Sequence, residues 1–560
     1  MFGPSLLSML AHTLWSSPNA FSSYAPGDGA LVRDLWAALR GSRRDELRLP
    51  VVARSKTPRR LLGELRDAPL ETMAVGGAAS LAWGWIPVAN LVRYHELTHT
   101  VPASEEVLDL LTPLRPMAAP ASASRASVSS LLAKTAPPGR QALTVAIVDR
   151  GERVPGGKAD DFGGQLDVLN PHGLELEAHA LAVLEALLAR LNSHGLLPSV
   201  RVACALVPEP SQPIALECFE HPNAKELLDA IQAVARHAGQ SQGPLLVNIS
   251  LGTHCGPHNG QSPLEDAVVA LATAPPATPP GAWFVHAAAG NDGLRNNHAI
   301  RHVAPGSPQA LRLYPGHGKQ LLVELWWDET LGGPLEVTVR VADPQGHPVL
   351  AQTRIDGKTA ARFQAPQGMW PYCRQSLCHQ RAYNDMSCIA FALTVDPTAT
   401  QATLGGLTVD FTLVAPRDTD VNGWIVVEPE GQTAMAAPSH FAGASGGGVC
   451  VPSTSPGAVC VSAVDVHGHP LPVASSGPPC DYGQKRIERP QLAHLGDAPA
   501  STAFGAGTSF AAPRACADAA RVLLSGKPCL TIKDLLRELA SVAARTPAQW
   551  DPQIGFAALV

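Results

Sequence analysis

The feature that most constrains the fold is a set of predominantly apolar segments that alternate with amphipathic ones. Three of them are "VRVACALV" (200–207), "PLLVNISLG" (244–252) and "AWFVHAAAGN" (282–291). Stretches with helical periodicity lie among them, such as "EAHALAVLEALLARL" and "AKELLDAIQAVARHA". Strands that are apolar on both sides belong inside a sheet covered by helices, and helical connections make neighbouring strands parallel. The sequence therefore predicts an α/β fold with a mainly parallel sheet in a three-layer α/β/α arrangement.

This rhythm stops near residue 305 and resumes after residue 438. Between them, segments such as "LEVTVRVADPQGHPV" and "LTVDFTLVAPRD" alternate apolar and polar residues and end in Gly, Pro or Asp turns. That pattern is typical of an antiparallel β-sandwich. We therefore expect a β-sandwich insertion at 305–438 that divides the α/β domain into a first part, 141–304, and a second part, 439–560. The second part ends in helices predicted at 508–524 and 532–545.

The first 115 residues predict a separate, small α+β domain. "LRLPVVARS" has the composition of a strand, and "TPRRLLGELRDA" and "VANLVRYHELTH" have helical patterns. The stretch that follows, 116–140, begins with "PMAAPASASRASVSS", which is rich in Pro, Ala and Ser and lacks periodicity. Such a composition is typical of a linker or exposed loop.

Composition limits the partners and the compartment. The 560 residues carry a net charge of −6 and only 16% charged residues, which argues against nucleic acid as a partner. No apolar run reaches the length of a membrane-spanning helix. The N-terminal apolar stretch has no Lys or Arg ahead of it, so it is a poor secretory signal. Eleven scattered cysteines do not suggest a disulfide framework, and we predict a cytoplasmic protein.

Four polar residues stand at the ends of the predicted strands and helices. Asp149 ends the apolar run of "VAIVDRG", and Asn291 follows "FVHAAAG". His179 opens one predicted helix, and Ser509 opens another after the glycines of "FGAGTSF". In open parallel sheets the carboxyl ends of the strands form the crevice that binds ligands. We therefore expect these four residues at one rim of the sheet.

The segments around these residues resemble the signature segments of the subtilisin-like serine protease (subtilase) family. The resemblance rests on "VAIVDRG" around Asp149, "VNISLG" at 247–252, "AAAGNDG" around Asn291 and "GTSFAAP" around Ser509, in the order that the family shows. It covers about 145–300 and 440–560. It implies a serine endopeptidase whose N-terminal domain is propeptide-like.

The resemblance also implies a role for each residue. Ser509 is the expected nucleophile, His179 the base that takes its proton, and Asp149 the carboxylate that fixes the imidazole tautomer. The side-chain amide of Asn291 and the backbone N–H of Ser509 are the expected oxyanion donors.

The surroundings of Ser509 fit a nucleophile at the start of a buried helix. The glycines before it are expected to let the chain turn sharply, and a helix N-terminus favours developing negative charge. Ala511 and Ala512 are small enough for the helix to lie deep in the core.

The histidine is chosen between two positions. The family usually shows His-Gly-Thr, whereas this chain has "HAL" at His179 and "HGL" at His172. His172 places Glu175 and Glu177 where the family's helix is apolar or small. His179 is followed by apolar residues at helical spacing, namely Val183, Leu184, Leu187 and Leu188. The sequence favours His179. The missing Gly-Thr, and Arg150 where the family has Ser or Thr, leave open a catalytically weak pseudoprotease that acts as a protein-binding scaffold.

Two further segments match those that line the substrate in this family. A protein or peptide substrate can pair with such backbone by β-addition. The expected substrate-binding residues are Ser250, Leu251, Gly252, Ala288, Ala289 and Gly290. We expect no cofactor. Structural calcium occurs in the family, but no acidic loop here is specific enough to assign a site.

A second catalytic pattern lies in the N-terminal domain. "YHELTH" (94–99) contains the His-Glu-x-x-His motif of zinc peptidases, with His95 and His99 one helical turn apart and Glu96 as the base. Thr100-Val101-Pro102 closes the helix directly afterwards, and no third ligand stands out. A zinc peptidase is therefore the less favoured alternative, and we assign no metal site.

Two other features have a structural and a functional interpretation. "THCGPH" contains His254, Cys255 and His258, which are favoured as a loop after a substrate-binding strand rather than as a metal cluster. Trp326-Trp327 in the β insertion are favoured as half core and half surface. They leave open a protein or carbohydrate partner that binds through the insertion.

Overall fold

The structure is a computed structural model, and only part of the chain is described in it. The described residues are 48–55, 71–74, 80–87, 107–110, 115–116, 125–136, 143–153, 162, 165–169, 174–208, 224–240, 243–273, 283–318, 320–350, 352–355, 361–364, 373–381, 386–395, 403–427, 438–444, 448–482, 487–499, 505–527 and 529–560.

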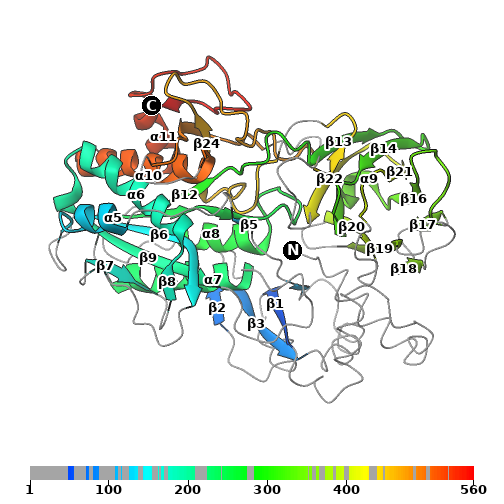
Figure 1. Cartoon of the computed structure of the whole chain (residues 1–560), viewed down its shortest axis with the longest axis horizontal. Helices are drawn as coiled ribbons and strands as arrows, with labels where there is room; N and C mark the ends of the chain where they lie inside the picture. Colours follow the sequence, from blue (N-terminus) through cyan, green and yellow to red (C-terminus); the bar gives the residue numbers. More distant parts are fainter. Residues whose placement is uncertain are drawn as a thin grey trace.

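A nine-stranded sheet forms the centre of the α/β unit (Figure 1). Its strands follow the order β26 (Ala558–Leu559), β25 (Leu492–Leu495), β24 (Ala458–Val464), β12 (Trp283–Ala288), β10 (Leu245–Ile249), β6 (Leu143–Arg153), β9 (Val200–Pro208) and β7 (Leu166–Val168). Each neighbouring pair in this order is parallel, and β8 (Leu174–Leu176) pairs antiparallel with the end of β6. The predicted α/β fold with a mainly parallel sheet is confirmed. Every residue of β9, β10 and β24 is buried, as expected for apolar strands inside a sheet that is covered on both faces.

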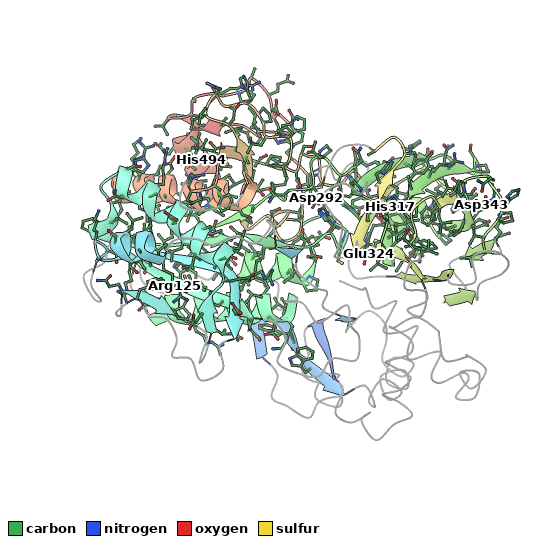
Figure 2. The ribbon with its side chains drawn as sticks, viewed as in Figure 1. Arg125, Asp292, His317, Glu324, Asp343 and His494 are labelled. Carbon is green, nitrogen blue, oxygen red and sulfur yellow. The ribbon has the colours of Figure 1, made fainter. Side chains whose placement is uncertain are left out.

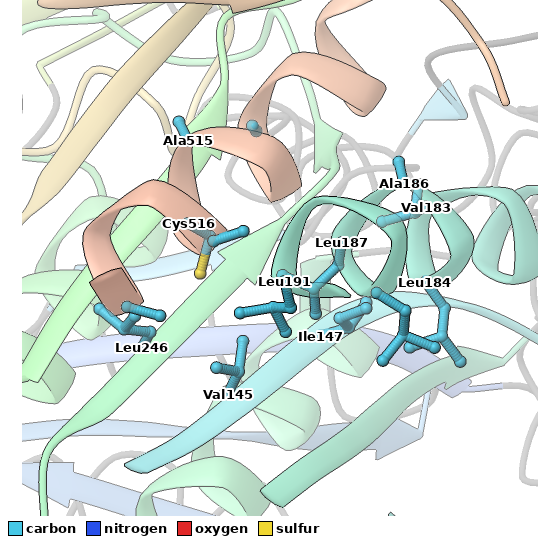
Figure 3. Close-up of a cluster of buried hydrophobic side chains, with 14 of the residues drawn as sticks. Val145, Ile147, Val183, Leu184, Ala186, Leu187, Leu191, Leu246, Ala515 and Cys516 are labelled. Carbon is cyan, nitrogen blue, oxygen red and sulfur yellow. The ribbon is translucent and has the colours of Figure 1, made fainter. Parts of the chain in front are cut away.

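Helices cover both faces of this sheet. On one face, α6 (Ala178–Ser193) and α10 (Thr508–Leu524) pack on β6 and β10 in the cluster that Figure 3 shows. The helices α5 (Arg125–Leu132) and α11 (Ile532–Ala540), the second shorter than predicted, extend this layer, and η4 (Leu197–Ser199) follows α6. On the other face lie α7 (Ala224–Gln240) and α8 (Pro263–Thr273). No helix in the described ranges is long and apolar enough to cross a membrane.

Helix α5 corrects one expectation. It lies within 116–140, which the sequence predicts as an exposed linker, and its Val128 and Leu132 are fully buried. These two residues are one helical turn apart, so a short apolar stripe packs against α6. The side chains of Ser127 and Glu185 join the two helices by a hydrogen bond of 2.7 Å.

Two antiparallel sheets stand between β12 and β24 in the chain and are called the β unit here (Figure 1, green to yellow). The first is β13 (His298–Val303), β22 (Thr419–Val427), β15 (Gln320–Asp328), β20 (Met386–Val395), β19 (Cys373–Arg381) and β18 (Ala361–Gln364). The second is β17 (Thr353–Ile355), β16 (Glu336–Ala342), β21 (Thr408–Val414), β14 (Gln309–Tyr314) and β23 (His440–Phe441). One apolar core lies between them, and the short helix α9 (Glu329–Gly332) follows β15.

The tryptophan pair of β15 is not at the surface. Trp327 lies in the core of the β unit and donates to the carbonyl of Gly333 at 3.0 Å. Trp326 points to the opposite face of the sheet, where it is 1% exposed. The expectation of a half-exposed pair is therefore wrong, because the second face of this sheet is covered as well.

The described part of the N-terminal region is a four-stranded antiparallel sheet (blue in Figure 1). Its order is β2 (Glu71–Ala74), β3 (Ser80–Pro87), β1 (Arg48–Ser55) and β4 (Val107–Leu110). Trp83 is buried in the core that α7 and α8 share, and its indole N–H donates to Asp229 of α7 at 2.7 Å. The two helices expected in this region, and the His-Glu-x-x-His motif at 95–99, lie outside the described residues.

Candidate active site

The structure brings Asp149 of β6 and His179 of α6 together. Nδ1 of His179 lies 2.8 Å from Oδ1 of Asp149, and the two residues are 3% and 0% exposed. An ionised carboxylate can only accept, so Nδ1 carries the proton and Nε2 is the basic nitrogen. Oδ1 of Asp149 also accepts from the backbone N–H of Arg150 at 2.7 Å, which fixes the carboxylate. The sequence favours His179 for the apolar pattern of its helix, and the structure places this residue beside Asp149; His172 lies outside the described residues.

Arg150, one of the departures from the pattern of the family that the sequence resembles, forms an ion pair beside this dyad. The Arg150 side chain lies 2.9 Å from Glu177, the residue that precedes helix α6. Burial raises the pKa of Glu177, and the nearby Arg150 charge opposes that rise. Glu175, the other acidic residue of this segment, belongs to β8 and pairs with Arg125 at 2.6 Å. The two glutamates therefore lie in strand β8 and directly before helix α6, not within that helix.

Ser509 is the second residue of α10 and is fully buried. Its Oγ makes no hydrogen bond with any described residue. Its carbonyl would normally accept from the residue four positions later, but that residue is Pro513, which has no N–H. The hydroxyl of Ser250 replaces that donor, at 3.1 Å from the Ser509 oxygen. Asn248 in turn donates to the Ser250 hydroxyl at 3.0 Å, so the end of β10 holds the backbone of the candidate nucleophile.

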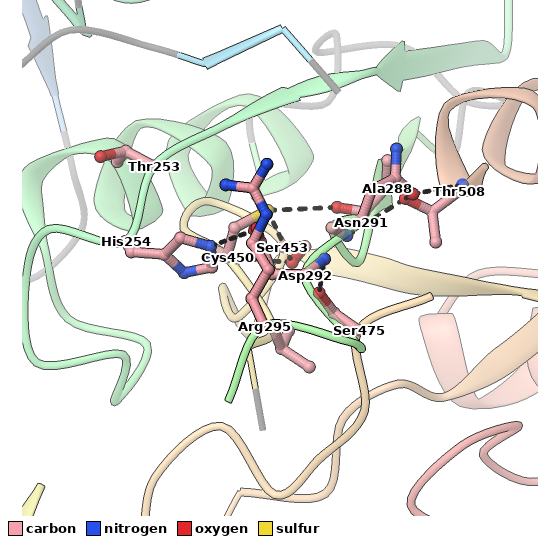
Figure 4. Close-up of polar contacts among 12 residues, drawn as sticks. Thr253, His254, Ala288, Asn291, Asp292, Arg295, Cys450, Ser453, Ser475 and Thr508 are labelled. Atoms are coloured by element: carbon pink, nitrogen blue, oxygen red, sulfur yellow. Dashed lines mark hydrogen bonds and ion pairs between the residues drawn. The ribbon is translucent and has the colours of Figure 1, made fainter. Parts of the chain in front are cut away.

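Asn291 follows β12 and faces the start of α10, as Figure 4 shows. Its Oδ1 accepts from the backbone N–H of Thr508 at 2.9 Å and from the Thr508 hydroxyl at 3.1 Å. The same hydroxyl accepts from the backbone N–H of Gly290 at 3.1 Å. These two contacts fix the orientation of the amide, with Oδ1 towards Thr508. The nitrogen, Nδ2, is the end of the amide that donates hydrogen bonds.

The glycine before Thr508 has a different role from the expected one. Gly507 has φ −177°, an extended conformation that any residue adopts, so it does not provide a left-handed turn. A Cβ at this position would lie 2.9 Å from Nδ2 of Asn291. The close approach of the Asn291 amide, rather than backbone conformation, therefore favours glycine here.

The expected substrate-binding residues divide into two groups. The short strand β11 (Leu251–Gly252) pairs antiparallel with β5 (Arg115–Pro116), a segment of the N-terminal region. The carbonyls of Ala289 and Gly290 instead accept from the backbone N–H groups of Cys450 and Ser475 at 2.9 Å each. Ala288, at the end of β12, pairs with Val461 of β24. Strand β11 therefore pairs with the N-terminal region, whereas Ala288, Ala289 and Gly290 pair within the α/β unit.

Sequence reasoning missed a polar network next to Asn291. His254 contacts Asp292 at 2.5 Å, and Arg295 contacts the same carboxylate at 3.2 Å (Figure 4). The backbone N–H of Asp292 donates to the Ser475 hydroxyl at 3.1 Å. Arg295 is three residues from Asp292, but His254 and Ser475 come from separate loops, so no local sequence signal joins them to Asp292.

The histidines of "THCGPH" do not form a metal site. His254 is engaged with Asp292, and both ring nitrogens of His258 face backbone carbonyls, those of Val449 and His254. Within the described ranges, no group of three or more His, Cys, Asp or Glu side chains is placed to hold a metal ion.

A second buried network fixes α6 against α10, away from the dyad. Asp518 of α10 accepts two hydrogen bonds from Arg190 of α6, at 2.9 and 3.0 Å, and contacts His494 of β25 at 3.1 Å. Burial alone would raise the pKa of Asp518, but the bonds from His494 and Arg190 hold it well below its usual range. The helices that carry His179 and Ser509 are therefore joined by a charged contact.

No family model matches the sequence, and no curated protein does at the level searched. Among solved structures, the chain is similar to the CspB protease of Clostridium perfringens, with a TM-score of 0.54 and 16% identity over 77% of this chain and 95% of that one. Weaker likenesses are those to a mutant of EpiP, the epidermin leader peptide processing serine protease of Staphylococcus aureus (TM-score 0.40, 11% identity, 92% and 98% covered), and to the MycP3 protease of the type VII (ESX-3) secretion system (0.32, 15%, 80% and 88%). Only the first carries an inference, and it shows that the chain shares the fold of that protease.

Proposed function

We propose that the chain is a subtilisin-like serine endopeptidase that cleaves proteins or peptides. The observation that carries this proposal is the buried hydrogen bond between His179 and Asp149, with the ring of Phe510, the residue after Ser509, 6.2 Å from the ring of His179. A histidine whose tautomer is fixed by a carboxylate is the arrangement that a serine nucleophile needs. The fold shared with a protease of known structure supports the same class of reaction.

The chemistry follows from the roles of these residues. Ser509 Oγ attacks the peptide carbonyl while Nε2 of His179 takes its proton, and Asp149 stabilises the imidazolium that forms. The negative oxygen of the tetrahedral intermediate is stabilised by the amide of Asn291 and the backbone N–H of Ser509. His179 then gives the proton to the leaving amine. Water attacks the acyl group while His179 takes its proton, and that proton passes to Ser509 Oγ as the carboxylic acid leaves.

A second candidate is a scaffold that binds peptides without turnover. The observation that favours it is the burial of the two residues: Ser509 is 0% and His179 is 3% exposed. A zymogen accounts for the same burial. In that arrangement the N-terminal sheet docks on α7 and α8, and β5 occupies the strand position beside β11 that an extended peptide would take.

Hydrolysis of an unstructured protein such as casein tests the proposal. Wild type should cleave it, and Ser509→Ala and His179→Ala should each lose several orders of magnitude of turnover, because triad members act as a unit. His172→Ala, a histidine change nearby in the sequence, is the matched control and should have a much smaller effect. Turnover that is insensitive to Ser509→Ala but lost with a chelator would instead favour the zinc peptidase.

A further inference from the structure

The loop 253–262, between β11 and α8, is held by contacts from both the α/β unit and the β unit. It begins directly after Gly252, whose strand carries the candidate peptide-binding backbone, and its Thr253 exchanges two backbone hydrogen bonds with Val451, at 2.8 and 2.9 Å. Further along, the hydroxyl of Tyr482 donates to the carbonyl of Pro257 at 2.7 Å. Val451 and Tyr482 belong to the second part of the α/β unit, so the loop is bound to that unit at Thr253 and at Pro257.

The contact from the β unit is made by a buried carboxylate. Oε2 of Glu324, on β15, accepts from the backbone N–H of Gly256 at 2.9 Å and from the indole N–H of Trp326 at 2.8 Å. Glu324 is fully buried, and burial raises its pKa. Figure 2 shows Glu324 and Asp292 near the junction of the β unit and the α/β unit. A carboxylate in such a place is costly, so its two hydrogen bonds are needed to retain it.

An aromatic stack lies beside this carboxylate contact. The indole of Trp424, on β22, is stacked between His258 of the loop and His298 of β13, with ring centroids 3.7 and 3.8 Å apart. Trp424 is fully buried, so this face of the β unit is packed against the loop rather than turned to solvent.

The same loop reaches the candidate oxyanion donor. His254 contacts Asp292 at 2.5 Å, and Asp292 directly follows Asn291. The His254 contact fixes the start of the loop beside the turn that carries Asn291, whereas Glu324 holds the loop two residues further on, at Gly256.

We propose that the β unit is part of the peptide-binding machinery, with Glu324 as a positioning residue that holds loop 253–262, and through it β11, in the conformation that binds an extended peptide. This inference rests on the proposed function. Glu324 acts through Gly256, so its loss should weaken binding along the strand more than it affects the chemistry at Ser509.

The test compares three variants of the full chain with two substrates. Glu324→Leu removes the acceptor, Glu324→Asp withdraws it by one methylene with the least disturbance, and Glu324→Gln keeps one carbonyl oxygen that can accept from both donors. Each is assayed on a hexapeptide and on a single-residue ester, and the rate of Ser509 labelling by a small fluorophosphonate is measured. Trp326→Phe is the matched control, because it removes the other partner of Oε2 but leaves the loop contact.

We expect the KM for the hexapeptide to rise about tenfold or more in Glu324→Leu and severalfold in Glu324→Asp. It should stay within about twofold of wild type in Glu324→Gln and Trp326→Phe. Ester hydrolysis and labelling should change by less than about twofold in all of them. An unchanged hexapeptide KM in Glu324→Leu or Glu324→Asp overturns the inference, as does a parallel loss of peptide, ester and labelling rates. Absence of labelling in wild type overturns the proposed function itself, which is a distinct outcome.

Discussion

The Nδ1 atom of His179 lies 2.8 Å from Oδ1 of Asp149, although the two residues come from different elements, helix α6 and strand β6. Both are buried, and the helix is fixed against α10 by the contact between Arg190 and Asp518. The pair is therefore set by packing rather than by local sequence.

The close contact between Gly507 and Asn291 predicts an effect of a single methyl group. Gly507→Ala places a Cβ 2.9 Å from Nδ2 of Asn291, so the amide must move. Loss of one oxyanion donor costs about 10²–10³ in turnover, and we expect a fall of that order with KM little changed. Gly505→Ala is the matched control, because nothing lies within 4 Å of a Cβ there. Equal turnover in both variants would show that the Asn291 amide does not serve the reaction.

The hydrogen bond from Ser250 to Ser509 predicts a rescue. Ser250→Ala leaves the buried Ser509 carbonyl without a donor, which should lower the free energy of unfolding by about 1–3 kcal/mol. Pro513→Ala restores a backbone N–H that can donate to this carbonyl, so the double variant should recover much of the loss. Urea unfolding of the four proteins measures the coupling. Strictly additive effects would contradict the exchange of donors described here.

These contacts show where sequence reasoning reaches its limit. The apolar runs predict the strands, and small residues at Ala511 and Ala512 predict a deep helix, because both depend on local pattern. The Ser250 hydroxyl supplies the hydrogen bond that Pro513 cannot give to the Ser509 carbonyl, and the two serines are far apart in the chain. No periodicity of the sequence indicates such a contact. The sequence does not predict helix α5, because its buried residues, Val128 and Leu132, are too few among Ala and Ser to give a clear helical pattern.

The packing of the N-terminal sheet on α7 predicts that weakening it activates the protein, if this sheet is inhibitory. Asp229→Ala removes the acceptor of the Trp83 indole and a partner of Lys225, so the initial rate of casein hydrolysis should rise severalfold. Asp410→Ala, which breaks an ion pair with Arg312 in the β unit, is the matched control. An unchanged rate in Asp229→Ala would leave the N-terminal sheet as a docking domain.

A buried histidine predicts the direction of the pH dependence of stability. Burial within β12 lowers the pKa of His286 to about 3, and neither ring nitrogen has a hydrogen-bond partner in the described structure. The unfolded chain binds this proton near pH 6.5, so the stabilisation is complete above that pH and is lost as the pH falls towards 3. From this group alone, moving from pH 7.5 to pH 5 should cost about 2 kcal/mol. His286→Leu should reduce that loss in urea unfolding, and His302→Leu, at a histidine 62% exposed, should not. A wild-type stability that rises on acidification would contradict this account.

Covalent labelling of Ser509 tests the central claim most directly. The full chain is treated with a fluorophosphonate, and the modified residue is located by tandem mass spectrometry of its peptides. The account predicts a single adduct on Ser509, absent in Ser509→Ala and formed much more slowly in His179→Ala, because Oγ is activated only by a neighbouring base. A wild-type protein that hydrolyses peptides with Ser509 unlabelled, or a labelling rate unaffected by His179→Ala, would contradict it.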